Sequence, residues 1–93
     1  MPSPHLKGFV LMSQPDRVLP GLGKALRALR EDRDLSQEQL SHETGIHRNY
    51  IGGIERGERS PTVAAVAALA DALGVPLDDL FKRAERLSKT SKD

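Results

Sequence analysis

Residues 36–56 contain two short helical segments that are separated only by residues 45–47. Ser36, followed by Gln39 three residues later, is the capping-box pattern that begins a helix. Gly45 ends the first segment, because glycine adopts the left-handed conformation of helix C-termini at little steric cost. This stretch therefore predicts two short helices joined by a tight turn, which only packing against further helices can stabilise.

Three further helices are predicted by apolar side chains that recur every three or four residues, the spacing of one buried helix face. One begins near Gly21 and ends at residues 31–34, another is capped by Thr62 and ends before Gly74, and the last has Pro76 in its first turn. No segment shows the alternation of a strand, and no internal repeat is present. We predict an all-α fold of five short helices around one core. The core stripes are Leu22, Leu26 and Leu29; Leu40; Ile46, Ile51 and Ile54; Val63, Val66, Leu69, Ala70 and Leu73; and Leu77, Leu80, Phe81, Ala84 and Leu87.

Length and composition exclude several classes of protein. The 93 residues are enough for one domain, and the lack of cysteine excludes a disulfide framework or a thiolate metal site. There is no apolar run of about 18 residues and no signal-peptide pattern, so we expect no membrane span and a cytoplasmic protein. We expect a flexible leader over residues 1–19, one helical domain over residues 20–87 and a basic tail over residues 88–93.

The charge distribution limits how the chain can bind nucleic acid. The formal net charge is only +1, and residues 20–81 hold seven Lys/Arg against ten Asp/Glu, whereas residues 82–93 hold five basic and two acidic residues. Binding to phosphates must therefore depend on a few placed residues and not on a general basic field. The chain has only one Tyr and two Phe, which argues against a platform that stacks single-stranded bases.

The two helices around the three-residue turn have the spacing of a helix-turn-helix motif. In that motif the second helix, here residues 48–56, lies in the major groove with its N-terminal residues on base edges, and the first helix crosses the DNA backbone. Arg48 and Asn49 begin this recognition helix and are expected to point outward. Arginine can bind guanine and asparagine can bind adenine, each through two hydrogen bonds. His47 precedes them, within reach of a base or a phosphate.

The stretch LSQEQLSHETGIHRNYIGGIERGERSPT resembles the Cro/C1-type (XRE-like) class of bacterial and phage repressors. The resemblance covers roughly residues 20–83, and it is strongest to small stand-alone regulators such as restriction–modification controller proteins. It implies a five-helix lambda-repressor-like domain with its helix-turn-helix at about residues 37–56. The matching residues are Ser36, Gln37, Leu40, Gly45, Ile46, Tyr50, Ile51, Ile54, Glu55, Arg56, Gly57, Pro61 and the later ALADALGVPLDDLF.

The resemblance also implies roles for residues around the recognition helix. Gln37 stands where family members typically bind a phosphate, and its backbone N–H at a helix start adds to that contact. Arg56 and Arg59 follow the recognition helix and suit the DNA backbone. His47 stands where relatives often carry a capping Ser or Thr, which predicts a poorly capped recognition helix. The predicted DNA-binding residues are Gln37, His47, Arg48, Asn49, Tyr50, Gly53, Arg56 and Arg59.

Two adjacent glycines, Gly52 and Gly53, lie inside the recognition helix, although each costs about 0.8–1 kcal/mol relative to alanine. Relatives often carry a polar base-reading side chain at position 53. We hypothesise that both glycines lie at the groove wall, where the lack of side chains lets the backbone approach DNA closely. Base reading would then concentrate in His47, Arg48 and Asn49.

Two structural roles follow for residues away from the turn. Glu55 resembles a family glutamate that pairs with an arginine of the first helix, here Arg30. The apolar stripe of the last helix continues beyond what one small core needs, so we expect it to form a homodimer interface together with the fourth helix. A dimer would bind two half-sites of a palindromic operator about one helical turn, roughly 34 Å, apart. The predicted interface residues are Leu77, Leu80, Ala84 and Leu87.

Other functions find little support in the residues. The sequence HETGIH looks like a stretched zinc motif, but His42 and His47 are five apart with Gly45 between them, so they do not share a helix face at i, i+4. No catalytic set or phosphate-binding loop stands out, and we predict no enzyme, cofactor, metal or small-molecule ligand. The predicted function is a sequence-specific double-stranded DNA-binding regulator of transcription, associated with the nucleoid. Two alternatives remain, an antitoxin of a toxin–antitoxin pair and a protein-interaction adaptor that keeps the fold without binding DNA.

Overall fold

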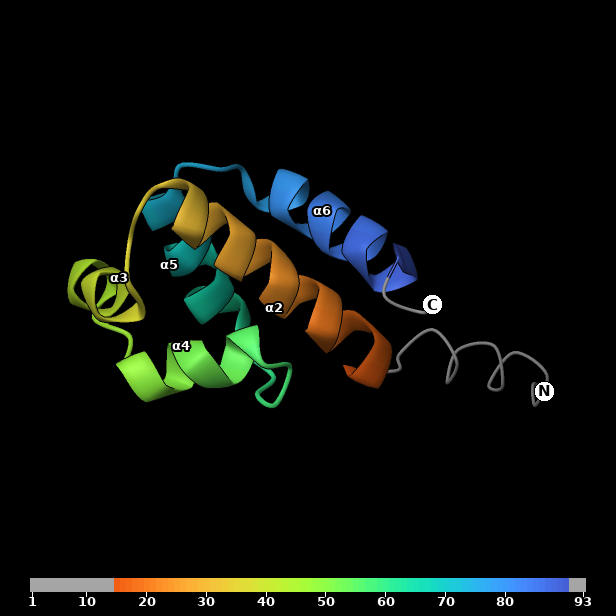
Figure 1. Cartoon of the computed structure of the whole chain (residues 1–93), viewed down its shortest axis with the longest axis horizontal. Helices are drawn as coiled ribbons and strands as arrows, with labels where there is room; N and C mark the ends of the chain where they lie inside the picture. The colour runs from red at the N-terminus through yellow and green to blue at the C-terminus, as the bar shows by residue number, and fades with distance from the viewer. Residues whose placement is uncertain (1–14, 91–93) are drawn as a thin grey trace, which may run out of the picture.

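The computed structural model describes residues 15–90, and the side chains of residues 19–88. Within this range the chain folds into five helices, and none of its residues lies in a strand. Helix α2 lies between α6, which runs along it, and α4 (Figure 1). The prediction of an all-α fold with five helices is confirmed. The helices are α2 (Pro15–Asp32), α3 (Gln37–Thr44), α4 (Arg48–Glu55), α5 (Val63–Leu73) and α6 (Leu77–Thr90).

Local signals in the sequence set the ends of the short helices. The Ser36 hydroxyl accepts a hydrogen bond from the Gln39 N–H at 3.0 Å, and the Gln39 Oε1 accepts one from the Ser36 N–H at 2.7 Å, which completes the predicted capping box. Gly45 ends α3 with φ 78°, in the left-handed region that favours glycine. The Thr62 hydroxyl caps α5 by accepting from the Ala65 N–H at 3.0 Å. Because Gly45 ends α3 and α4 begins at Arg48, a three-residue turn separates the two helices.

The outer boundaries differ from the prediction. Helix α2 begins at Pro15 and not near Gly21, so the final part of the predicted leader is helical, and residues 1–14 lie outside the described residues. Proline is well tolerated in a first helical turn, and packing of α2 along α6 and α4 favours a longer helix despite Pro20. At the other end α6 begins at Leu77 and continues to Thr90, into the predicted tail, and residues 91–93 lie outside the described residues.

The core is built from every helix in the described range. Its largest fully buried side chains are Leu26, Leu40, Ile51, Ile54, Leu69, Leu73 and Leu80. Leu80 and Ala84 have relative exposures of 0% and 2%, so the prediction that they form a dimer interface is wrong. A core of this size needs the apolar face of α6 to close it, and α6 packs that face inward. No helix within residues 15–90 is long and apolar enough to cross a membrane.

Candidate nucleic-acid interface

The first turn of α4 presents polar side chains to solvent. His47, Arg48 and Asn49 are all exposed, as predicted for groups that contact DNA. His47 is the N-cap of α4, and its Nδ1 accepts a hydrogen bond from the Asn49 N–H at 3.0 Å. The expectation of a poorly capped recognition helix is therefore wrong, because the imidazole takes the place of the usual hydroxyl. The cap holds the first turn of α4 in a defined conformation.

A buried ion pair holds α4, the predicted recognition helix, against α2. Arg30 Nε donates to Glu55 Oε2 at 2.7 Å and Arg30 Nη2 donates to Glu55 Oε1 at 3.0 Å, with side-chain exposures of 10% and 4%. This two-pronged geometry is the one in which a guanidinium binds a carboxylate most strongly. The hydrogen bond to Glu55 raises the pKa of Arg30 above its usual value, against the opposing effect of burial. The structure thus contains the ion pair that the family resemblance implied.

The same carboxylate also connects α3 to α4. Gln37 Nε2 donates to Glu55 Oε1 at 2.9 Å, and Arg30 Nη1 donates to the Leu35 carbonyl oxygen at 2.7 Å. Glu55 therefore joins residues from α2, α3 and α4 in one hydrogen-bonded group. The side chain of Gln37 is engaged within the protein, while its backbone N–H lies in the first turn of α3, where helix N–H groups lack intrahelical acceptors.

The two glycines of α4 are covered by the protein's own side chains. Both are buried, although they carry no side chain of their own. A Cβ on Gly52 would lie 3.0 Å from Arg56 Nη1 and 3.3 Å from Gln37 Oε1, and one on Gly53 would lie 2.5 Å from Arg59 Cγ. The hypothesis that these glycines leave bare backbone for DNA is therefore wrong, and Gly53 is not itself an exposed DNA contact.

Residues 26–80, more than half of the chain, match the model of a helix-turn-helix family. The chain belongs to this family. It is 42% identical over 62 residues to the control protein C.SmaI of Serratia marcescens, a match that covers 67% of this chain and 74% of the relative. It is 39% identical over 60 residues to the control protein C.BamHI of Bacillus amyloliquefaciens, covering 63% of this chain and 74% of that protein.

A solved structure supports the same assignment. The crystal structure of the restriction–modification controller protein C.AhdI from Aeromonas hydrophila aligns with a TM-score of 0.65 at 40% identity, covering 67% of this chain and 94% of that one. Further relatives are named as transcriptional regulators or repressors. This helix-turn-helix protein is therefore a transcriptional regulator and not an enzyme, and the predicted family resemblance is confirmed.

Two contacts beside the candidate interface were not predicted from the sequence. Arg56 Nε forms an ion pair with Glu58 Oε1 at 3.1 Å, and both side chains are more than half exposed. The Arg59 guanidinium carbon lies 5.6 Å from the centre of the half-buried Tyr50 ring, within the range of a cation–π interaction. Both contacts involve residues of the loop after α4, whose sequence has no helical pattern from which its conformation could be predicted. The Arg56–Glu58 pair has one sequence signal, which is that opposite charges stand two residues apart.

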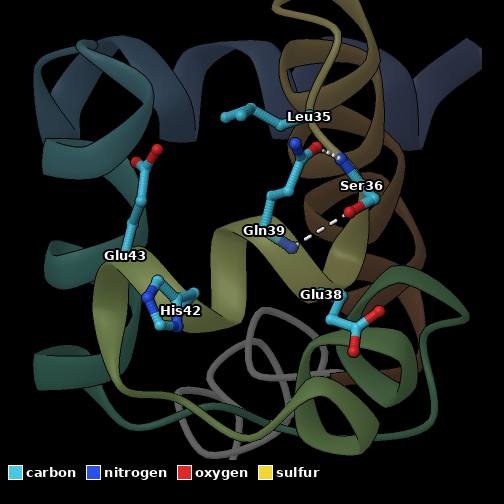
Figure 2. A pocket seen from close by; sticks show the side chains of 6 residues that line it. All are labelled: Leu35, Ser36, Glu38, Gln39, His42 and Glu43. Atoms are coloured by element: carbon cyan, nitrogen blue, oxygen red, sulfur yellow. Dashed lines mark hydrogen bonds between the residues drawn. The ribbon is translucent and has the colours of Figure 1, made fainter.

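The outer face of α3 carries an open depression (Figure 2). The side chains of Glu38, His42 and Glu43 are exposed there, and the capping box of Ser36 and Gln39 closes one side. Within residues 15–90, no group of three or more His, Cys, Asp or Glu side chains is placed to hold a metal ion. The depression thus lies on α3 and the two residues before it, separate from the first turn of α4. It is lined by Leu35, Ser36, Glu38, Gln39, His42 and Glu43.

Proposed function

We propose that this regulator binds double-stranded DNA sequence-specifically, as a homodimer on a palindromic operator, with α4 in the major groove. The observation that carries the proposal is the exposure of Arg48 and Asn49 on the first turn of a helix that buried contacts hold in place. A fixed helix presenting donors and acceptors at its N-terminal end matches the way helix-turn-helix proteins contact bases. Such a protein would act in the cytoplasm, at the nucleoid.

The exposed side chains divide into two kinds of contact. Arg48 has the planar pair of donors that binds guanine in the major groove, and Asn49 has the donor and acceptor that bind adenine. Arg56 and Arg59 follow α4 and suit phosphates, which fix the orientation of the protein on the duplex. Arg56 would have to leave Glu58 or share its charge, since the two are paired in the free protein. The N–H groups at the start of α3 supply a further phosphate contact.

The base-reading role can be tested after selecting bound duplexes from a random double-stranded pool. Arg48→Ala and Asn49→Ala are each expected to weaken binding to the selected duplex by about 1–3 kcal/mol and to relax the preference at one base pair. Titrations by fluorescence anisotropy at fixed salt measure the loss. The matched control is Arg83→Ala, which removes the same charge from α6, on the opposite side of α2 from α4 (Figure 1).

Two results would contradict this role. If Arg83→Ala weakens binding as much as Arg48→Ala, the arginine acts only through net charge. If no duplex is enriched and affinity does not depend on salt, the protein does not bind DNA in this way, because phosphate contacts release counterions. That second result would favour the protein-interaction adaptor.

The proposed dimer must use apolar groups that the core leaves exposed. Leu80 and Ala84 are buried, whereas Phe81 on the same helix is 43% exposed and Val63 on α5 is 75% exposed. Leu77 and Leu87 are half-buried at the edges of the core. An exposed phenylalanine is costly in water, since its burial is worth about 1.5–3 kcal/mol. We therefore centre the proposed interface on Phe81 and the exposed end of α5.

Phe81→Ser is expected to shift the protein from dimer to monomer in analytical ultracentrifugation at micromolar concentration, and to weaken binding to a palindromic duplex more than tenfold. Loss of a central aromatic side chain removes about 2 kcal/mol or more from an interface. The neighbouring exposed residue gives the control Lys82→Ser, which should leave the dimer intact. A wild-type protein that stays monomeric at high concentration while binding the palindrome normally would contradict the dimer.

A further inference from the structure

The centre of the outward face of α4 is occupied by a side chain that does not belong to α4. Asn49 and Gly53 are four residues apart, so they lie on the same face of the helix. Asn49 is exposed, yet Gly53, one turn further along, is buried. The atom nearest to a Cβ built on Gly53 is Arg59 Cγ, at 2.5 Å. Arg59 therefore lies across the recognition helix at the position where a side chain of residue 53 would stand.

The loop after α4 fixes the backbone of Arg59 above this position. Gly57 has φ 75°, a left-handed conformation that turns the chain back toward α4. The Gly53 carbonyl oxygen then accepts hydrogen bonds from the Glu58 N–H at 2.8 Å and from the Arg59 N–H at 3.2 Å. The start of the Arg59 side chain is thus anchored to the same residue that its methylene groups cover.

The far end of the Arg59 side chain is held by an aromatic ring. Its guanidinium carbon lies 5.6 Å from the centre of the Tyr50 ring. Tyr50 and Gly53 are three residues apart and therefore adjacent on the surface of α4. The stem of Arg59 rests on Gly53 and its charge rests on Tyr50, so the guanidinium is placed in advance beside the exposed first turn of α4.

We propose that Gly53 and Tyr50 form a seat that positions Arg59 as part of the DNA-recognition surface, one turn beyond Asn49. The inference rests on the proposed function, because it assigns Arg59 a guanidinium contact with duplex DNA. The seat explains the second glycine: the position stays free of a side chain so that a longer, charged one from the loop can occupy it. Gly53 and Tyr50 are positioning residues, and Arg59 makes the contact.

The geometry distinguishes Gly53 from its neighbour Gly52. A methyl group on Gly53 would meet Arg59 near its anchored backbone, with Cβ at 3.4 Å and Cγ at 2.5 Å, so only rotation of the side chain off α4 relieves the overlap. A methyl group on Gly52 would meet the terminal atoms of Arg56 and Gln37, at 3.0 and 3.3 Å, which can move by a few tenths of an ångström. Gly52→Ala is therefore a matched control for Gly53→Ala.

The seat can be tested in the free protein, because Tyr50 is the only tyrosine and the chain has no tryptophan. Gly53→Ala and Arg59→Ala are expected to shift the proton NMR signals of the Tyr50 ring in the same direction, since both remove the guanidinium from it. Gly52→Ala should leave these signals close to those of the wild type. Unchanged ring signals in Gly53→Ala would overturn the seat, whatever the protein binds.

The role in recognition is tested by affinity for the duplex selected from the random pool. Arg59→Ala and Gly53→Ala are each expected to weaken binding about 5- to 150-fold, the range for one well-placed guanidinium contact. The double variant should bind as Arg59→Ala alone does. The variants are also titrated with duplexes that differ from the selected one at single base pairs. If Arg59→Ala loses the preference at one base pair, Arg59 contacts a guanine, and if it binds all duplexes equally more weakly, Arg59 contacts a phosphate. Either result supports the proposal.

Two affinity results would overturn the recognition role. In the first, Gly53→Ala weakens binding to the duplex as much in a protein that already carries Arg59→Ala as it does in the wild type. The effect of Gly53 would then not depend on Arg59, and the backbone of α4 would approach DNA directly. In the second, the Arg59→Ala variant binds the selected duplex as tightly as the wild type does. If the wild type binds no duplex at all, the proposed function fails and the DNA contact of Arg59 fails with it, while the ring signals still test the seat.

Discussion

Glu55→Ala is expected to destabilise the regulator by about 3–5 kcal/mol, because it leaves the Arg30 guanidinium buried without its partner. The substitution removes both hydrogen bonds that Arg30 donates to Glu55 and the one that Gln37 donates to it, and leaves Arg30 only its bond to the Leu35 carbonyl oxygen. Urea unfolding followed by circular dichroism measures the change. Native domains have only about 5–15 kcal/mol of stability, so the loss removes a substantial share of it and should lower the urea midpoint clearly.

An exposed ion pair on α2, the helix that carries Arg30, provides the control for this prediction. Arg27 and Glu31 are four residues apart on α2, with a 3.0 Å contact and side-chain exposures of 64% and 55%. Water screens such a pair, so Glu31→Ala should cost less than about 1 kcal/mol. Equal losses in Glu31→Ala and Glu55→Ala would show that burial gives the inner pair no special role.

The Glu55 group also explains how a short helix can hold its exposed side chains in a fixed direction. An isolated helix of eight residues is unstable in water, so α4 depends on its contacts for its shape and direction. Ile51 and Ile54 bury one side of it, His47 caps its start, and Glu55 fixes its end to α2 and α3. The outward residues Arg48 and Asn49 are presented by a helix held at both ends.

The sequence predicted those features that depend on a few neighbouring residues. The capping box at Ser36, the stop at Gly45 and the Thr62 cap each involve groups no more than four residues apart, and all three are present. The stop at Gly45 also sets where the turn between α3 and α4 begins. The Arg30–Glu55 pair, which joins residues 25 apart, was accessible only through the family resemblance.

Features set by the packing of distant segments could not be predicted in the same way. Spacing along α6 places Leu80 and Phe81 in one apolar stripe, but the packing of α6 against α2 and α5 decides that Leu80 is buried and Phe81 is exposed. The position of Gly53 in the helix predicts a residue that faces the groove. In the structure the loop after α4 folds back, and Arg59 covers Gly53. The residue type at position 47 predicts a weak cap because relatives carry Ser or Thr there, but the Nδ1 of His47 accepts the same kind of hydrogen bond.

Gly23→Ala is expected to destabilise the fold by about 2–3 kcal/mol, although alanine is the better helix former by about 1 kcal/mol. A Cβ on Gly23 would overlap the Ile54 carbonyl oxygen and lie 2.6 Å from the Glu55 carbonyl oxygen. Both are backbone atoms of the last turn of α4, so they cannot rotate away as a side chain does. The added methyl group must push α2 and α4 apart, and urea unfolding measures the cost.

The same substitution at Gly52 separates this steric effect from helix propensity. Gly52→Ala adds an identical methyl group inside a helix but meets only flexible side-chain ends, so its stability should stay level or rise by up to about 1 kcal/mol. A stabilised Gly23→Ala variant would contradict the close packing of α2 on α4. Because the displaced turn carries Glu55, we also expect Gly23→Ala to reduce affinity for the selected duplex at temperatures where it stays folded. Position 23 is buried where α2 packs against the last turn of α4, so its methyl group cannot contact DNA itself, and that loss would report on the displacement of α4.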